Sequence, residues 1–390
     1  MELTKRKLGW PEDLAAFAVP EEILAYCREL AEDHSKAEDD WQQIYHAWAE
    51  ANPALASSFQ AALERRDLRD LTLAELVGLA KKDEATRATS GRVLNYLSGK
   101  SSYLFGGSAD LAPSNNTRIE GGVSFSHAHP EGATIHFGVR ESAMAAMANG
   151  IALHGGLRPY AATFLVFSDY LKGSIRLSAL MELPVIYILT HDSIAVGEDG
   201  PTHQPVEHLN MLRSIPGLTV YRPAGRYETA AAWYGAIHNE GPSVLALSRQ
   251  TIKAEGTDAQ GVEKGAYLVR DCEDPDILIL ASGSELPVAL EAADLLEGEG
   301  ISARLVSMVS MEVFEKQDPD YREKILPPGL RKRLALEAAS PTPWYRYTGL
   351  DGAVMGIDRF GASAPGAKVM EEYGFTPESV AETARRLVRG

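Results

Sequence analysis

The sequence contains only two cysteines and no long apolar run. Cys27 and Cys272 lie far apart and have no ligand-like spacing, so nothing indicates a disulfide framework. No stretch approaches the roughly 20 apolar residues that a membrane-spanning helix needs. The basic segment Met1 to Lys7 is followed by Trp10 and Pro11 rather than by an apolar segment, which is not the pattern of a secretory signal. These absences predict a protein of the reducing cytoplasm with no membrane partner.

An excess of positive charge is also absent. The 390 residues include 38 Lys and Arg against 54 Asp and Glu, a formal net charge of −16. This balance excludes nucleic acid as an expected partner, although a local basic pocket for a small phosphate is compatible with it. Hydrophobic residues at 45% and charged residues at 24% are typical of globular proteins. The length corresponds to two or three domains.

The pattern of apolar residues divides the chain into three parts. Residues 1–83 show helical spacing, for example at Ile23, Cys27 and Leu30, and predict a helical arm or linker. In residues 84–250, and again in 265–390, short apolar runs alternate with amphipathic or Ala-rich stretches, and the polar segment 251–264 links them. This alternation predicts two α/β domains with parallel sheets. The expected strands are 103–105, 134–137, 184–190, 218–221, 243–247, 276–281, 303–307 and 333–337, and the expected helices are 141–154, 168–181, 226–238 and 285–296.

Ligands of parallel sheets bind at the carboxyl ends of the strands, so polar residues just after apolar runs are the first candidates for a site. The loop after the run 184–190 carries His191, His203 and three carboxylates among glycines and prolines. It is consistent with a solvated surface loop as well as with a site. A metal site at His203, Glu207 and His208 is disfavoured, because Pro205 interrupts the segment and the spacing departs from known ligand motifs.

Glu141 opens a helical stretch that continues with small residues. A carboxylate there is ordinarily stabilised by the helix dipole, but close packing of the small residues would bury it and suit it to hydrogen bonding with a heterocycle. Phe164, Phe167 and Tyr170 recur every three residues, a spacing that is more often found in core packing than in a cofactor platform. Three further side chains are candidates for binding phosphate, although each arginine alone is more typical of a surface ion pair: Arg87, Ser114 and Arg249.

Taken together, these segments resemble transketolase, the thiamine-diphosphate enzyme that moves two-carbon ketol units between sugar phosphates. The resemblance runs from about Leu8 to the end of the chain. It implies that residues 84–250 form the pyrimidine-binding domain and residues 265–390 the transketolase C-terminal domain, after a helical linker. The matching segments are GGSADLAPSN (106–115), HFGVRE (136–141), TFLVFSDY (163–170), THDSIAVGEDGPTHQPVEH (190–208) and LSRQ (247–250).

The resemblance also implies roles for individual residues. Glu141 is expected to pair with the aminopyrimidine ring nitrogen of the cofactor, and His203 to act near the reacting carbonyl. The expected contacts of the cofactor rings are Phe167, Phe164, Tyr170 and Asp110. The expected ligands of the sugar phosphate are Arg87, Ser114, His191, Asp199, His203 and Arg249.

The sequence has no G-D-G motif with a downstream asparagine, the mark of the domain that holds the cofactor diphosphate and Mg²⁺ in complete transketolases. The resemblance therefore implies a chain that lacks this domain, holds no metal itself and is active only with a partner subunit that binds Mg²⁺. A homodimer through the helix 141–154 is also implied. The alternative is a non-catalytic or regulatory truncated relative, or a fragment that folds.

Overall fold

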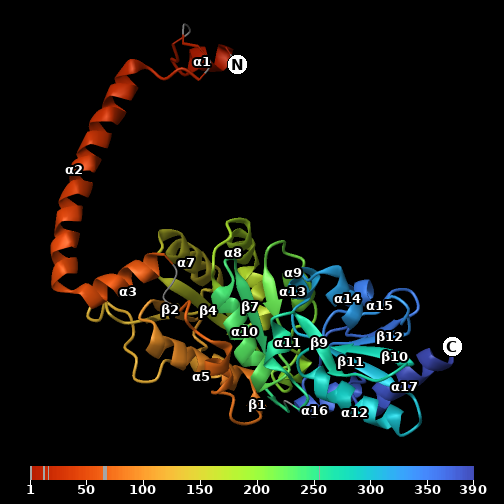
Figure 1. Cartoon of the computed structure of the whole chain (residues 1–390). Coiled ribbons are helices and arrows are strands. Elements are labelled where there is room, and N and C mark those ends of the chain that lie inside the picture. The colour runs from red at the N-terminus through yellow and green to blue at the C-terminus, as the bar shows by residue number, and fades with distance from the viewer. Residues whose placement is uncertain (1, 12–13, 16, 65–67, 254) are drawn as a thin grey trace. The chain divides into compact units, whose positions relative to one another are not determined.

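The computed structural model describes residues 2–11, 14–15, 17–64, 68–253 and 255–390 (Figure 1), which form two compact units, Met1–Ala61 and Ala62–Gly390. The first unit contains α1 (Glu2–Lys7), the long helix α2 (Glu21–Ala51) and most of α3 (Pro53–Leu63), as the predicted helical arm requires. Tyr45 of α2 stacks on Trp41 with ring centroids 5.2 Å apart and also contacts Phe59 of α3. Within the described ranges, no helix is both long and apolar enough to cross a membrane.

The second unit contains a six-stranded sheet with the strand order β3-β2-β4-β5-β7-β6. All neighbouring strands in this sheet are parallel. One face is covered by α5 (Thr86–Lys100) and α10 (Arg226–His238), and the other by α7 (Glu141–His154) and α8 (Ser168–Leu180). The sheet is buried on both faces, which explains its continuous apolar runs. Its strands are β2 (Leu104–Ser108), β3 (Thr134–His136), β4 (Arg158–Phe164), β5 (Ile186–Thr190), β6 (Thr219–Tyr221) and β7 (Ser243–Leu247).

A second sheet of five strands follows in the order β13-β12-β10-β11-β9. Helices α12 (Glu285–Glu297) and α17 (Pro377–Arg389) pack on one face, and α13 (Met311–Glu315), α14 (Pro319–Ile325) and α15 (Tyr345–Thr348) on the other. The α/β fold class with two sheets is therefore confirmed. The strands are β9 (Ala266–Arg270), β10 (Ile277–Ala281), β11 (Ala303–Met308), β12 (Arg333–Leu336) and β13 (Ala353–Met355).

Several elements depart from the sequence-based expectations. The central strand β4 was not predicted, because Pro159 and its alanines weaken the strand signal, although every residue of it is buried. The edge strand β9 runs antiparallel, so the second sheet is mixed rather than parallel. The expected linker 251–264 contains β8 (Thr251–Ile252), which pairs with β1 (Glu84–Ala85), and α11 (Ala259–Val262).

The end of the predicted arm also packs differently from a linker. Leu68, Leu71 and Leu76 belong to the hydrophobic core beneath the six-stranded sheet, and Leu76 lies in α4 (Leu73–Val77). Burial of these leucines against α10 explains why this segment folds with the second unit rather than with α2.

The register of the six-stranded sheet brings its candidate segments to one edge. Thr190 at the end of β5 lies opposite both Phe164 of β4 and Leu247 of β7. Ser108 at the end of β2 lies opposite Ala162. The segments that follow these four strands therefore begin side by side, as expected for a parallel sheet that binds ligands at its carboxyl edge.

Candidate functional site

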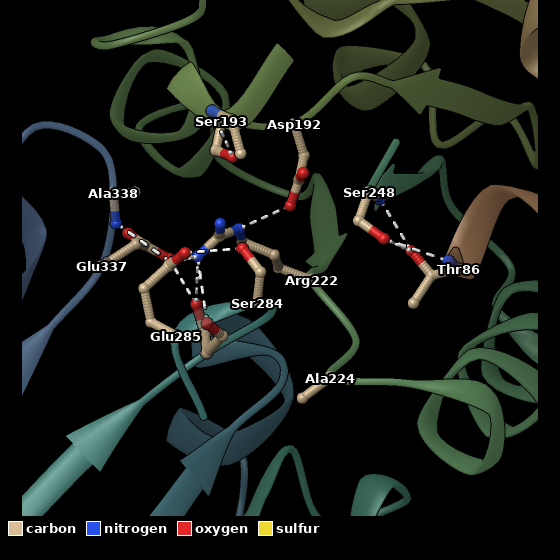
Figure 2. A network of polar contacts seen from close by, with 12 residues as sticks. Thr86, Asp192, Ser193, Arg222, Ala224, Ser248, Ser284, Glu285, Glu337 and Ala338 are labelled. Atoms are coloured by element: carbon tan, nitrogen blue, oxygen red, sulfur yellow. Dashed lines mark hydrogen bonds and ion pairs between the residues drawn. The ribbon is translucent and has the colours of Figure 1, made fainter. Parts of the chain in front are cut away.

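Two arginines are brought together at the carboxyl edge by hydrogen bonds between distant segments. Thr86, at the start of α5, accepts a hydrogen bond from the Ser248 backbone N–H at 2.7 Å, and the two side-chain hydroxyls lie 3.1 Å apart (Figure 2). Both residues are buried. The next residue in each segment is an arginine, Arg87 and Arg249, and the proximity of Arg249 contributes, after burial, to a lowered pKa of Arg87. The pair is thus a concentrated positive charge on an acidic protein.

His191 lies next to this arginine pair. Nη1 of Arg87 donates to the Ser114 carbonyl at 2.5 Å and approaches Nε2 of His191 at 3.5 Å. On the other side of the ring, Thr190 Oγ1 lies 2.8 Å from Nδ1 and donates its proton to Asn115. Nδ1–H is then the donor to Thr190, which leaves Nε2 as an acceptor facing the guanidinium.

Burial and the nearby positive charges keep His191 neutral. The ring is 3% exposed. Burial first, then Arg87, Arg249 and His203, lower its pKa to about 3. A neutral imidazole beside two arginines adds no negative charge to the site, so binding an anion there would relieve the unbalanced positive charge.

Two residues of this edge hold a backbone conformation that L-amino acids rarely adopt. His191 has φ of 62° after β5, and Asp110 has φ of 61° two residues after β2. Neither is a glycine, so both positions carry conformational strain that the surrounding structure must offset. Strain of this kind at the carboxyl edge of a sheet is typical of residues placed for binding.

Arg87, Arg249, Ser114 and His191 together form what we call the arginine group. A cavity of about 520 Å³ lies beside it. Glu141, the first residue of α7, contributes a carboxylate that is only 8% exposed. Apolar backbone and side chains complete the wall at Ala109, Leu111 and Val139. The other polar and aromatic residues in the wall are Asp110, Phe167, Tyr170 and His203.

Phe164 joins this cavity to the arginine group. Its ring stacks on His191 with centroids 3.7 Å apart, and on Phe167 with centroids 5.9 Å apart. Phe167, in the turn η1 (Leu165–Phe167), meets His203 edge-on at 5.5 Å. The two groups of polar residues are therefore parts of one continuous site.

The structure assembles ten of the predicted site residues into these two groups, and it places one apart. Asp199 lies exposed on the loop between η2 (Ile194–Val196) and α9 (His208–Arg213) and does not line the cavity. The disfavoured metal combination with His203 is not formed. Among the described residues, His208 groups instead with Asp169 and Glu207, and its Nε2 lies 3.2 Å from Asp169 Oδ1.

Sequence reasoning missed the polar residues that support this site. Asn115 and Thr190 orient His191, and Thr86 and Ser248 align the two arginines. Thr190 ends a predicted strand, which was a usable signal. The others are brought to the site by tertiary structure, and no local pattern marks them.

Three family models match the chain in sequence order. The model described as the transketolase thiamine diphosphate binding domain matches residues 1–67. The transketolase pyrimidine binding domain matches residues 82–254, and the transketolase-like TK C-terminal domain matches residues 265–376. The chain belongs to the transketolase family. The predicted resemblance is therefore confirmed at the level of the family.

Transketolases of known sequence are similar over nearly the whole of this chain. It is 48% identical to a probable transketolase of Streptococcus pneumoniae, with 98% of this chain and 59% of the relative covered. It is also 48% identical to a transketolase of Geobacillus stearothermophilus, with 99% of this chain and 59% of the relative covered. The chain thus spans about 59% of the length of these relatives.

Solved structures show the same relationship. Transketolase from Leishmania mexicana superimposes with a TM-score of 0.91 at 38% identity, over 99% of this chain and 57% of that chain. A structure titled split gene transketolase, inactive beta4 tetramer, matches with a TM-score of 0.65 at 25% identity, over 78% of this chain and 98% of that chain.

The match of residues 1–67 corrects one expectation. We expected a chain without the diphosphate-binding domain, and the helical arm was assigned to a linker because it shows no glycine-rich or metal-ligand motif. The arm instead matches the model of that domain. The motif we looked for marks only one part of the domain, so its absence did not show that the whole domain is missing.

Proposed function

We propose that this chain takes part in transketolase catalysis, the transfer of a two-carbon ketol unit from a ketose phosphate to an aldose phosphate, as in the pentose phosphate pathway. The continuity of the Glu141 cavity with the arginine group, through the stacked ring of Phe164, is the observation that carries this proposal. One end suits an apolar heterocycle with a polar edge, and the other suits a phosphate.

The cavity fits the aminopyrimidine ring of thiamine diphosphate. Phe167 and Tyr170 offer aromatic faces, and the shielded carboxylate of Glu141 can hydrogen-bond a ring nitrogen. When bound, the cofactor supplies a carbon nucleophile and an electron sink. Glu141 holds the proton at the ring nitrogen, and Asp110, which also lines the cavity, contacts the cofactor rings in this proposal.

The sugar phosphate occupies the other half of the site in this proposal. The guanidinium groups of Arg87 and Arg249 pair with phosphate oxygens, and Ser114 and His191 complete the phosphate contacts. The carbohydrate hydroxyls reach the loop after β5, where Asp199 and His203 accept or donate hydrogen bonds. His203 also lines the cofactor cavity, which supports a role for it near the reacting carbonyl.

The Mg²⁺ ligands and the diphosphate contacts come, in this proposal, from polypeptide outside these 390 residues. No G-D-G motif occurs in the sequence. The similar protein titled split gene transketolase, inactive beta4 tetramer, has a length that this chain nearly covers, which supports a chain that needs a second polypeptide for activity.

We also propose homodimerisation across α7 and α8, because both helices expose large apolar residues, namely Met147, Leu153, Leu177 and Leu180.

The pyrimidine-binding and C-terminal domains are assigned, in this proposal, to residues 84–250 and 265–390. Each domain is built on one of the two sheets.

Reconstitution tests the proposal. The purified chain is assayed for ketol transfer from xylulose 5-phosphate to ribose 5-phosphate with thiamine diphosphate and Mg²⁺, alone and with a polypeptide that carries the G-D-G motif. We expect activity only with the second polypeptide. In the active mixture, Glu141→Ala and Glu141→Gln should lose most of kcat, because neither side chain can exchange a proton with the ring nitrogen.

Glu378→Ala is the matched control, because Glu378 also lies in the first turn of a helix but is exposed in α17. Its kcat should equal that of the unmodified chain. Robust turnover by the chain alone would refute the need for a second polypeptide, and full activity of Glu141→Ala would refute the role of this carboxylate.

A further inference from the structure

The loop between β5 and α9 carries three of the proposed substrate ligands, His191, Asp199 and His203. Its local backbone hydrogen bonds are those of tight turns, such as the bond from the His203 N–H to the Gly200 carbonyl at 3.0 Å. Turns of this kind set the shape of a loop but do not fix its position relative to the sheet. The position depends on contacts with other segments. Besides the contacts of His191 and His203 within the domain of the six-stranded sheet, two groups of contacts connect the loop to the C-terminal domain.

The first group is centred on Arg222, which follows β6 and is completely buried. Its Nε donates to Asp192 Oδ2 at 3.0 Å, directly after His191 in the loop. Its Nη1 donates to the Ser282 carbonyl at 3.0 Å and forms an ion pair with Glu285 (Figure 2). Ser282 and Glu285 both belong to the C-terminal domain. One guanidinium therefore connects the start of the substrate loop to the second sheet.

The second group lies at the far end of the loop. Gln204 Nε2 donates to the Gly197 carbonyl at 2.9 Å and to the Ala362 carbonyl at 3.0 Å. The hydroxyl of Ser363 donates to the Glu198 carbonyl at 2.6 Å. Ala362 and Ser363 belong to the segment before α16 (Gly366–Glu372), so the C-terminal domain bonds directly to the residue that precedes Asp199.

The backbones of the two segments also approach too closely for most side chains. A Cβ added at Gly366 would lie 2.3 Å from the Ala195 carbonyl oxygen, and one added at Gly361 would lie 1.7 Å from Gln204 Oε1. The contact at Gly366 is with backbone and requires glycine, whereas the contact at Gly361 is with the end of the Gln204 side chain, which would have to move. The packing of the segment 361–366 on the loop is thus specific, and a single methyl group would displace one from the other.

We propose that the C-terminal domain positions the loop after β5 for substrate binding, with Arg222 and Ser363 as positioning residues. This inference rests on the proposed function, because it takes His191, Asp199 and His203 as substrate ligands. A loop held at both ends loses little conformational entropy when the sugar phosphate binds. The free energy of substrate binding is therefore not reduced by the cost of ordering the loop.

Ser363→Ala is the most informative variant, because Ser363 is exposed and its loss should not unfold the protein. In the reconstituted enzyme, KM for xylulose 5-phosphate should rise about two- to fivefold, the effect of one net hydrogen bond, with a smaller change in kcat. Ser363→Thr keeps the hydroxyl and should restore KM. Ser379→Ala removes a hydroxyl that accepts a hydrogen bond from Thr376 in the same domain, and should leave KM unchanged.

Amide hydrogen exchange of the chain gives a second measurement that does not depend on turnover. Residues 194–204 should exchange faster in Ser363→Ala, and faster still in Gly366→Ala, while the strands keep their protection. Unchanged exchange of this segment in both variants, or faster exchange with an unchanged KM, would overturn the inference. The two proposals can fail separately. If the unmodified reconstituted protein shows no ketol transfer, the proposed function is refuted. Faster exchange of residues 194–204 in the variants would still support the anchoring of the loop.

Discussion

The buried ion pair between Arg213 and Glu337 should contribute far more to stability than an exposed pair of the same geometry. Arg213 ends α9 and Glu337 follows β12, so this pair joins the two sheets. Nη1 and Nη2 of Arg213 donate to the two carboxylate oxygens at 2.7 and 2.9 Å. On the surface, Arg385 makes the same two-pronged contact with Glu299, with both distances at 2.7 Å. The chain thus contains a matched pair of perturbations that differ in burial.

The magnitude follows from the environment of Glu337. Burial raises its pKa, but Arg213, Arg222 and the hydroxyl of Ser282 outweigh burial and hold the pKa at about 2, against an ordinary value of 4.5. That difference corresponds to about 3 kcal/mol in favour of the charged form in the folded protein. Because the folded-state pKa is depressed, this stability is present above about pH 4.5 and is lost as the pH falls towards 2.

Glu337→Gln is therefore expected to destabilise the protein by about 3 to 5 kcal/mol at pH 7, since Arg213 would be left buried opposite a neutral amide. Thermal unfolding followed by calorimetry should show a midpoint about 4 to 6 °C below that of the unmodified chain. Glu299→Gln should shift the midpoint little, because water screens the exposed pair. If the two variants melt at the same temperature, the interdomain pair does not stabilise the fold as argued.

Three further outcomes are expected. The pKa of His191 is lowered to about 3 by burial and by nearby positive charges, so its NMR resonances should not titrate between pH 5 and 8. In the unfolded chain, the same imidazole takes up a proton below about pH 6.5. The folded protein should therefore lose stability as the pH falls below about 6.5. Arg249→Ala should raise KM for phosphorylated sugars more than it lowers kcat in the reconstituted enzyme, because in the proposed site it binds the phosphate, which does not react. Gly106→Ala should prevent normal folding of β2, since the added Cβ would lie 2.0 Å from the Tyr160 carbonyl oxygen. The control Gly99→Ala places its methyl group in open space in α5. It should raise the unfolding free energy, measured by urea unfolding, by about 0.5 to 1 kcal/mol.

The sequence predicted those parts of the fold whose signals are local. The run from Pro184 to Thr190 is continuously apolar and was predicted as a strand, and β5 occupies Ile186–Thr190. Arg158–Phe164 was missed because a proline and small residues dilute the same signal, although β4 is a central strand. The antiparallel direction of β9 depends on its pairing with β11, which no local pattern specifies.

The candidate site shows the same division. His191 directly follows the predicted strand 184–190, so the rule for parallel sheets made it a candidate without knowledge of tertiary contacts, whereas Arg249 was a candidate because guanidinium groups bind phosphate. Asp192 stands in the same segment, but its partner Arg222 is 30 residues away, and no local pattern marks this arginine as buried. The burial of Arg222 and its bonds to the second sheet result from the packing of the two domains. The spacing of residues within one domain does not predict that packing.

The strongly acidic composition and the proposed phosphate site are compatible because electrostatic interactions are local at physiological ionic strength. Charges farther than about 8 Å from a ligand are largely screened by salt, so the net charge of −16 acts on distant or extended polyanions. Arg87 is half-buried and lies beside Arg249 and a neutral His191, where water screens the field less. A small phosphate that enters the site meets these groups rather than the average surface. The expectation of no nucleic-acid partner, which rests on the net charge, is therefore compatible with the proposed binding of a sugar phosphate.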